Sequence, residues 1–325
     1  MRYPSLSRAV EGFLLNVSAS GRSHNTIRNY RTDLNRFTRY LENPAVHQVT
    51  SEKIKEFLSW FKNDYRITHV ATTPIEPRKI SKKTLRNAHG ALSVFWKWVS
   101  KEFQLNNPFD VPPIKVYPKP ISPLSEQEIK SLLSACKQSN KNPKNKKSYS
   151  SIRPTYKRDK AIILTLLDTG IRVSELCNIQ VGDFYSENGR IIVTGKGSKT
   201  RFVYLGKVGC KAIWSYLLER FPNRQPLKDD PLYVNRNGIH PLSRNGVFQL
   251  VKRLGEKAGV QDVYPHRFRH TFAIEFLRNG GNVFELQQLL GHSDLEMSRR
   301  YALIAQIDLE TSARKASPAD RWRLR

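Results

Sequence analysis

The chain has 325 residues, 39% of them hydrophobic, and carries 55 Lys and Arg against 28 Asp and Glu side chains, a net charge of +27. This length predicts two compact domains, and this charge indicates a polyanionic partner. The absence of low-complexity basic arms argues against a ribosomal or chromatin-packing protein. Residues 1–121 carry 20 basic and 9 acidic side chains and residues 122–325 carry 35 and 19, so we expect both parts to contact the same polyanion.

Three cysteines, Cys136, Cys177 and Cys210, are scattered along the chain. Their odd number and their spacing fit neither a disulfide framework nor a zinc site, and they indicate a reducing compartment. The N-terminus lacks the pattern of a signal peptide, and no apolar run is long enough to cross a bilayer. The sequence therefore predicts a cytoplasmic, nucleoid-associated protein that contacts no membrane.

Apolar residues recur at helical spacing through the first third of the chain. The pattern predicts two helices between Leu6 and Leu41, a third from about Thr50, and a fourth from about Ser81 to Glu102. Residues 109–123 contain five prolines, which favour an extended segment without helix. We therefore expect a helical domain over residues 1–110, a linker over 111–121 and a second domain over 122–325.

The second domain is predicted to be mainly helical with one small antiparallel sheet. A capping-box pattern at Ser125 and Glu128 begins its first helix. The stretch 137–160, with nine basic side chains and one acidic, is either a mobile loop that contacts phosphates or a solvated surface loop. Residues 159–167 have the pattern of a buried helix, and the alternating, β-branched residues 189–206 predict a β-hairpin. Further helices are expected at residues 211–220, 246–258, 267–279 and 283–290, an order that gives no support to a Rossmann fold or a barrel.

Side chains suited to phosphate chemistry occur in four separate segments of the second domain. Arginine binds a phosphate through two hydrogen bonds from a planar group that stays charged. Two arginines at helix starts are therefore expected to hold one phosphate from both sides. The whole set comprises Arg172 with Glu175, Lys196, His266 with Arg269, and His292 with Tyr301.

These segments resemble the four signature blocks of the tyrosine recombinase or phage integrase family. The matching stretches, in order and spacing, are TGIRVSEL (169–176), GKGSKTR (195–201), HRFRH (266–270) and LGHSDLEMSRRY (290–301). The resemblance implies a helical core-binding domain followed by the family's catalytic fold. It also implies a homotetramer on double-stranded DNA that carries specific recombination sites, with reciprocal contacts through an oligomerisation segment at residues 303–325. The catalytic residues that it implies are Arg172, Lys196, His266, Arg269, His292 and Tyr301.

The proton transfers of phosphodiester cleavage suit three of these side chains. Tyr301 must lose its proton as it attacks, since the unperturbed pKa of a tyrosine is ~10. His266 is the expected proton acceptor. Lys196 is the expected general acid for the leaving 5′ oxygen, which would otherwise depart as an alkoxide.

The remaining side chains suit charge stabilisation. Negative charge builds on the non-bridging oxygens of the phosphorane, where Arg172 and Arg269 are the expected donors and His292 a further one. Glu175, one helical turn from Arg172, is expected to hold a neighbouring side chain in place. No carboxylate cluster suggests a Mg²⁺ site, so we expect neither a metal nor a cofactor.

Other interpretations of single residues stay open. Lys199 and Arg201 rival Lys196 as the general acid. His266 and His270 stand at the spacing of a zinc pair, although no third ligand is evident. His270 by itself is more typical of a buried structural histidine or of a partner to a catalytic group.

The predicted function is site-specific DNA recombination through a Holliday junction, in integration, transposition or resolution, with accessory proteins as further partners. A 3′-phosphotyrosine intermediate conserves the bond energy, so rejoining needs no ATP, and the sequence contains no nucleotide-binding loop. Two alternatives stay open: a type IB topoisomerase and a catalytically inert DNA-binding protein of the same fold.

Overall fold

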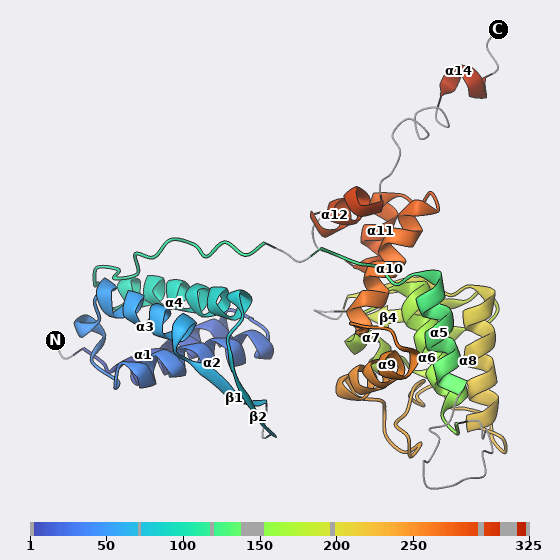
Figure 1. The fold of residues 1–325 in the computed structure, drawn as a ribbon, viewed down its shortest axis with the longest axis horizontal. Coiled ribbons are helices and arrows are strands. Elements are labelled where there is room, and N and C mark those ends of the chain that lie inside the picture. The colour runs from blue at the N-terminus through green and yellow to red at the C-terminus, as the bar shows by residue number, and fades with distance from the viewer. Residues whose placement is uncertain are drawn as a thin grey trace. The chain divides into compact units, whose positions relative to one another are not determined.

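The computed structural model of the protein describes residues 3–70, 73–117, 120–137, 153–195, 199–291, 296–305 and 317–322. The chain folds into two units, Met1–Lys119 and Pro120–Arg325. The division between them falls within the proline-rich stretch of residues 111–121. Helices make up most of both units (Figure 1). Each unit has a hydrophobic core of its own.

Amphipathic helices build the first unit, as the apolar spacing predicts. They are α1 (Leu6–Ala19), α2 (His24–Tyr40), α3 (Ser51–Asn63) and α4 (Lys82–Phe103), with the short 3-10 helix η1 (Val46–Gln48) before α3. Side-chain oxygens of Ser23, Thr50 and Ser81 accept backbone N–H groups at the starts of α2, α3 and α4. The helices pack around buried aromatic rings, among them Phe13, Phe37, Phe57, Phe95 and Trp96.

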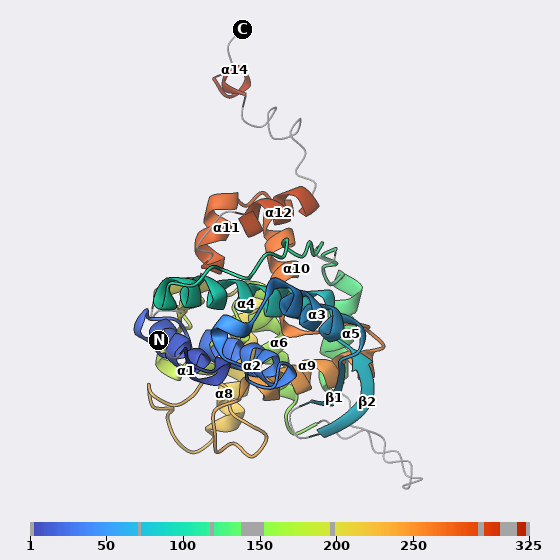
Figure 2. The ribbon, with the colours of Figure 1, turned by 90° about the vertical axis from the view of Figure 1, so that its left-hand side faces the viewer.

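Between α3 and α4 the chain forms an antiparallel β-hairpin that the sequence does not predict. β1 (Arg66–Val70) pairs with β2 (Thr73–Lys79), and Arg66 lies opposite Lys79. Figures 1 and 2 show this two-stranded ribbon extending away from the helices of its unit. Two prolines within β2 weaken the strand signal in the sequence, because proline cannot donate to a strand ladder.

Helices also dominate the second unit, which confirms the predicted mainly helical fold class. Its larger core gathers around α6 (Tyr156–Thr169), which contacts α5 (Glu126–Lys137), α8 (Lys207–Arg220) and α10 (Pro265–Arg278), while α9 (Arg244–Ala258) packs on α5. Because α6 begins at Tyr156, the last residues of the stretch 137–160 are helical and not a loop. Residues 138–152 of that stretch lie outside the described part of the chain.

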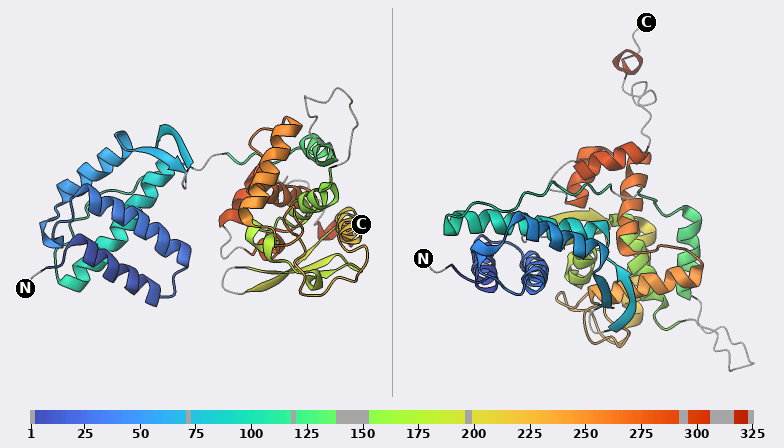
Figure 3. Two further views of the ribbon diagram at one scale, coloured as in Figure 1. Left: turned by 90° about the horizontal axis from the view of Figure 1, so that it is seen from below. Right: turned by 60° about the vertical axis from the view of Figure 1, so that its left-hand side comes forward.

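A three-stranded antiparallel sheet lies at the edge of the second unit (Figure 3). It follows α7 (Val173–Asn178) and the 3-10 helix η2 (Val181–Asp183), and its order is β3 (Phe184–Tyr185), β4 (Arg190–Thr194), β5 (Thr200–Tyr204). The pairing of β4 with β5 confirms the hairpin predicted at residues 189–206. Ile191, Val193 and Val203 turn into the core, and this fixes the register of the sheet.

A smaller core joins α10 to α11 (Val283–Leu290) and α12 (Glu296–Ala305). The sequence does not predict α12, which carries the fully buried Tyr301. Near the C-terminus the structure describes α14 (Pro318–Arg321), and most of the predicted oligomerisation segment 303–325 lies outside the described residues. In the described part of the chain no helix is long and apolar enough to cross a membrane.

Candidate active site

The end of α6 and the start of α7 place Arg172 beside Glu175. Gly170 caps the C-terminal end of α6. Its φ of 58° lies in the left-handed region, and a Cβ there would lie 2.4 Å from the Phe272 ring. Only glycine suits both constraints. The chain then turns directly into α7, where the Arg172 backbone N–H donates to Glu175 Oε2 at 2.8 Å and Arg172 Nη1 donates to Oε1 at 2.9 Å.

Glu175 is only 2% exposed and binds a second arginine, which comes from the sheet. Arg201 of β5 donates from Nη1 to Oε1 at 3.0 Å and from Nη2 to Oε2 at 2.8 Å. Burial acts to raise the pKa of Glu175, but hydrogen bonds from Arg201 and Arg172 outweigh it and hold the pKa below its ordinary value. The carboxylate therefore stays ionised and holds two guanidinium groups that come from different elements.

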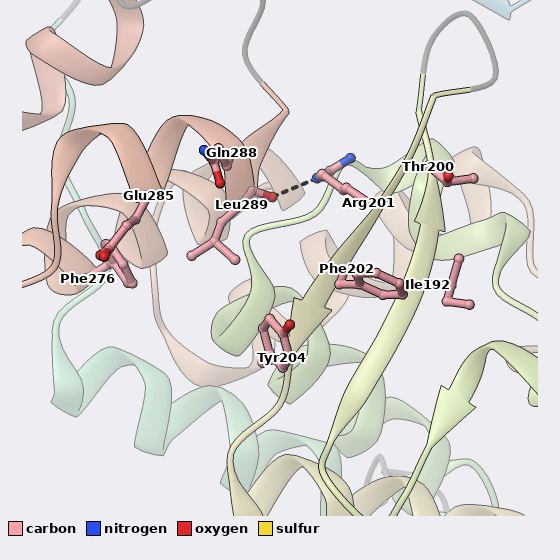
Figure 4. A pocket seen from close by; sticks show the side chains of 9 residues that line it. All are labelled: Ile192, Thr200, Arg201, Phe202, Tyr204, Phe276, Glu285, Gln288 and Leu289. Carbon is pink, nitrogen blue, oxygen red and sulfur yellow. Dashed lines mark hydrogen bonds between the residues drawn. The ribbon is translucent and has the colours of Figure 1, made fainter.

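Arg201 also reaches α11. Its Nε donates to the Leu289 carbonyl at 2.7 Å, and Figure 4 shows the side chain crossing from the strand toward that helix. The Arg201 side chain thus connects β5 to the start of α7, through Glu175, and to the end of α11, through the Leu289 carbonyl.

Arg269 connects the ends of α6 and α11. It is 2% exposed, and its Nη1 and Nη2 donate at 2.8 Å to the carbonyls of Gly170 and Leu290. Burial, followed by the charge of Arg172, lowers the pKa of Arg269 to about 10, so the group is still charged at pH 7. Arg172 Nη2 donates to the Gly291 carbonyl at 3.2 Å. Both guanidinium groups are therefore bound at the same end of α11.

Tyr301 lies with its hydroxyl against α10. The hydroxyl oxygen is 2.7 Å from His270 Nδ1, and the side chain is 0% exposed. Burial, followed by the charges of His266 and Arg269, lowers the pKa of His270 to about 4, so the imidazole is neutral at pH 7 and its Nδ1 can accept the phenolic hydrogen. Burial also raises the pKa of Tyr301, against the opposing charge of Arg269. The free protein thus keeps this phenol protonated and enclosed.

The structure brings most of the described candidate residues together, and Arg269 is the link between them. It shares a helix end with Arg172 and acts electrostatically on Tyr301. His266, one turn before His270 on α10, is exposed, and the centroids of the two rings are 4.8 Å apart.

Lys196 and His292 lie outside the described residues, but the residue that precedes each of them contacts the site. A Cβ on Gly195, the neighbour of Lys196, would lie 3.4 Å from Glu175 Oε1. Gly291, the neighbour of His292, accepts the hydrogen bond from Arg172. Gly195 therefore lies beside Glu175, and Gly291 lies beside Arg172.

Both units match models of one protein family. Residues 123–306 match the phage integrase family, and residues 10–104 match the phage integrase N-terminal SAM-like domain. Tyrosine recombinase XerC of Staphylococcus epidermidis is 32% identical over 304 residues, which cover 91% of this chain and 92% of that protein. This chain belongs to the phage integrase family.

Further relatives share the sequence or the fold of this integrase-family chain. Tyrosine recombinase XerA of Saccharolobus solfataricus is 29% identical over 315 residues, which cover 96% of this chain and 94% of that protein. The Tn1549 transposon integrase in complex with a circular intermediate DNA superposes with a TM-score of 0.67 at 21% identity, covering 99% of this chain and 100% of that one. A lambda integrase dimer bound to a COC′ core site gives 0.68 at 15% identity, covering 92% and 77%. The tyrosine recombinase fold is thus confirmed.

The sequence of this integrase-family chain does not predict two contacts of the site. Arg201 is a rival general acid by sequence, whereas the structure shows its guanidinium bound to Glu175 and Leu289. The pairing of His270 with Tyr301 has no signal in the sequence. In both cases the partners lie at least 26 residues apart in the chain, beyond the reach of any local pattern. Among the described residues, no group of three or more His, Cys, Asp or Glu is placed to hold a metal ion.

We expect the integrase-family chain to lose stability as the pH falls from 6.5 toward 4, with His270 as one cause. The unfolded chain protonates this side chain near its ordinary pKa of 6.5, whereas the folded protein does so only at about 4. The unfolded state therefore binds more protons in this window, and the free energy of unfolding rises with pH across it. His270→Gln removes the titration and keeps an oxygen that can accept from Tyr301, so it should lose less stability between pH 7 and pH 5.

Urea unfolding followed by circular dichroism at both pH values checks this prediction. His240→Gln is the matched control, because His240 is exposed in the same unit and its replacement should keep the wild-type pH dependence. Equal pH dependence in the His270→Gln variant and the wild type would show that the His270 imidazole titrates normally.

Proposed function

We propose that the protein is a site-specific recombinase that cuts and rejoins duplex DNA through a covalent bond between Tyr301 and a 3′ phosphate. One observation carries the proposal. Arg172 and Arg269 are bound at one end of α11, and the Tyr301 hydroxyl is hydrogen-bonded to His270, the residue after Arg269. Two fixed guanidinium groups suit the two non-bridging oxygens of one phosphate.

The proposed reaction is an in-line exchange at phosphorus. The Tyr301 oxygen attacks the phosphorus atom, the bond to the 5′ oxygen breaks, and the products are a 3′-phosphotyrosine and a 5′ hydroxyl. Arg172 and Arg269 donate to the oxygens on which charge builds, with His292 as a further donor, because preorganised donors stabilise the phosphorane more than the ground state. Lys196 gives a proton to the 5′ oxygen. The reverse attack by the 5′ hydroxyl rejoins the strand without ATP.

The phenol has to leave its present position for this step. Tyr301 is 0% exposed, so no phosphate of a duplex can reach its hydroxyl in the free protein. We assign the hydrogen bond that the Tyr301 hydroxyl donates to His270 Nδ1 to this resting arrangement. His266, exposed one turn earlier on the same helix, is then the proton acceptor once DNA has displaced α12.

Double-stranded DNA is the proposed partner of both units. Their net charges, +11 for residues 1–121 and +16 for residues 122–325, are too large for solubility alone. Solved relatives of this fold carry DNA, among them the Tn1549 and lambda integrases. Because phosphate contacts release counterions, binding should weaken steeply with salt.

The general acid can be identified with a modified substrate. A duplex whose scissile 5′ oxygen is replaced by sulfur has a leaving group of low pKa that needs no proton. Lys196→Ala should therefore cleave normal DNA about 10²-fold or more slowly and the sulfur substrate at nearly the wild-type rate. Single-turnover cleavage of both substrates measures the effect.

Two variants of neighbouring cations are the controls for this experiment. Lys199→Ala, at an exposed position, should cleave both substrates normally. Arg201→Met should be slow on both, because Arg201 positions Glu175 and Arg172 and donates no proton to the 5′ oxygen. If the sulfur substrate restored the cleavage rate of Arg201→Met and not that of Lys196→Ala, the general acid would be Arg201 and not Lys196.

Recombination also requires two duplexes. We propose a homotetramer that exchanges strands through a Holliday junction, with contacts between protomers through residues 303–325.

The recombination sites are identified by sequencing the DNA ends that remain attached to the protein in cells. Purified protein is then incubated with a plasmid that carries two such sites, in EDTA and without ATP. Joined or inverted segments support recombination, relaxation alone would indicate a type IB topoisomerase, and neither product with intact binding would indicate an inert DNA-binding protein.

A further inference from the structure

The β1–β2 ribbon of the first unit adds little to the core from which it extends. Between residues 66 and 79, none of the described side chains belongs to the core or packs against it, whereas Tyr65 and Ile80 at the two ends do. A two-stranded hairpin is at best marginally stable by itself. Figure 2 and the right-hand view of Figure 3 show the ribbon extending beyond the helices of its unit. Packing therefore does not account for its presence.

Like charges face each other across the ribbon. Arg66 lies directly opposite Lys79, and the next pair places Arg78 opposite Ile67. Like charges in opposite positions destabilise a hairpin. The Arg66 guanidinium turns back to the carbonyls of Asn63 and Tyr65, so the strand edge presents Arg78 and Lys79 to solvent.

The positive strip continues from β2 into the first turns of α4. Residues 66–86 contain one acidic side chain, Glu76, and six basic ones, Arg66, Arg78, Lys79, Lys82, Lys83 and Arg86. Apart from Arg66 these cations are exposed, and the ion pairs found within the described part of the first unit lie elsewhere, on α1 and α2. Such a strip repels itself in the free protein and is stabilised by a bound polyanion.

We propose that the β1–β2 ribbon, with the first turns of α4, binds the phosphates of duplex DNA through Arg78 and Lys79. This inference rests on the proposed function, and it adds a contact that the helices of the unit do not supply. A two-stranded ribbon fits the width of the major groove, so its strand edge can follow the phosphates of the groove wall. A second copy of the chain is a poorer occupant, because it too carries a net charge of +27.

The test compares two double variants that each remove two positive charges from exposed positions. Arg78→Ala/Lys79→Ala changes the ribbon, and Lys97→Ala/Lys101→Ala changes the far end of α4, ~20 Å or more away along the helix. Binding to a fluorescent duplex of arbitrary sequence is measured by anisotropy over a series of salt concentrations. The ribbon variant should bind roughly tenfold more weakly, and the slope of log K against log salt should shrink by about 2, whereas the control should change far less.

A charge-conserving change and a fold measurement complete the design. Arg78→Lys should keep the wild-type slope, since a phosphate contact requires the charge and not the guanidinium shape. Thermal unfolding of the ribbon variant should match the wild type, because the replaced side chains are outside the core.

Equal losses of affinity and slope in the ribbon and control variants would overturn the inference. A ribbon variant that binds DNA normally but fails to join two sites would also overturn it, because the ribbon would then be a contact between protomers. The proposed function is tested separately, by formation of the covalent complex between Tyr301 and DNA. If the ribbon contributes to duplex binding but the protein never forms this complex, the inference holds and the proposed function is wrong. If the complex forms but the ribbon does not contribute to duplex binding, the proposed function holds and the inference is wrong.

Discussion

Tyr301→Phe is expected to abolish strand cleavage and the covalent protein–DNA complex while DNA binding stays at the wild-type level. The variant lacks the attacking oxygen, so the rate should fall by at least ~10⁴-fold. The ring still fills the core between α10, α11 and α12, and the lost hydrogen bond to His270 should cost only about 1 kcal/mol of folding stability. A nicked duplex that traps the intermediate measures the complex on a denaturing gel, and anisotropy measures binding.

Tyr264→Phe is the matched control for this experiment. Tyr264 precedes α10, is 42% exposed and lies close enough to Tyr301 to influence its pKa. The control should form the covalent complex at the wild-type rate. A wild-type yield of complex from Tyr301→Phe, or its loss from Tyr264→Phe alone, would place the nucleophile elsewhere.

Arg172→Ala and Arg269→Ala should both slow cleavage strongly, by about 3–4 kcal/mol of activation free energy each, because each removes a fixed donor to the charged phosphorane. Their effects on folding should differ. Arg269→Ala leaves the carbonyls of Gly170 and Leu290 without donors at a buried position, so the free energy of unfolding should fall by about 3 kcal/mol or more. The Arg172 side chain is 39% exposed and Glu175 keeps Arg201, so Arg172→Ala should cost about 1 kcal/mol or less.

Single-turnover cleavage at saturating protein and urea unfolding of the same preparations separate the two effects. Arg172→Lys tests the geometry, since it keeps the charge and loses the planar fork, and it should recover only part of the rate. If Arg172→Ala weakened DNA binding but cleaved bound DNA at the wild-type rate, this arginine would be a binding residue and not a catalytic one.

The parts of the site that the sequence predicts are those held by local geometry. Arg172 and Glu175 are three residues apart at a helix start, so their contact follows from the backbone of one turn. The hairpin of β4 and β5 follows from alternation and turn residues, which also act over a few positions. The amphipathic helices of the first unit are predicted for the same reason.

The elements that the sequence does not predict have weak local signals. The apolar positions of α12 are sparse in its first half, and the packing of this helix on α10 and α11 supplies the stability that its own sequence lacks. β2 contains prolines, which hide a strand, and its partner β1 is only five residues long.

By itself the sequence determined the class of the protein and its two-part organisation into helical segments. It also determined the identities and spacings of the residues suited to phosphate chemistry. Charge, periodicity and short motifs are properties of neighbouring residues, so they can be read without the tertiary structure. Only the tertiary structure decided that Arg201 reaches from the sheet to Glu175 and α11, and that the Tyr301 hydroxyl is hydrogen-bonded to His270. These contacts join residues 26 to 88 positions apart, and they exist because separate helices and a sheet bury their apolar faces against one another. Hydrophobic packing therefore sets the distances on which the proposed chemistry depends.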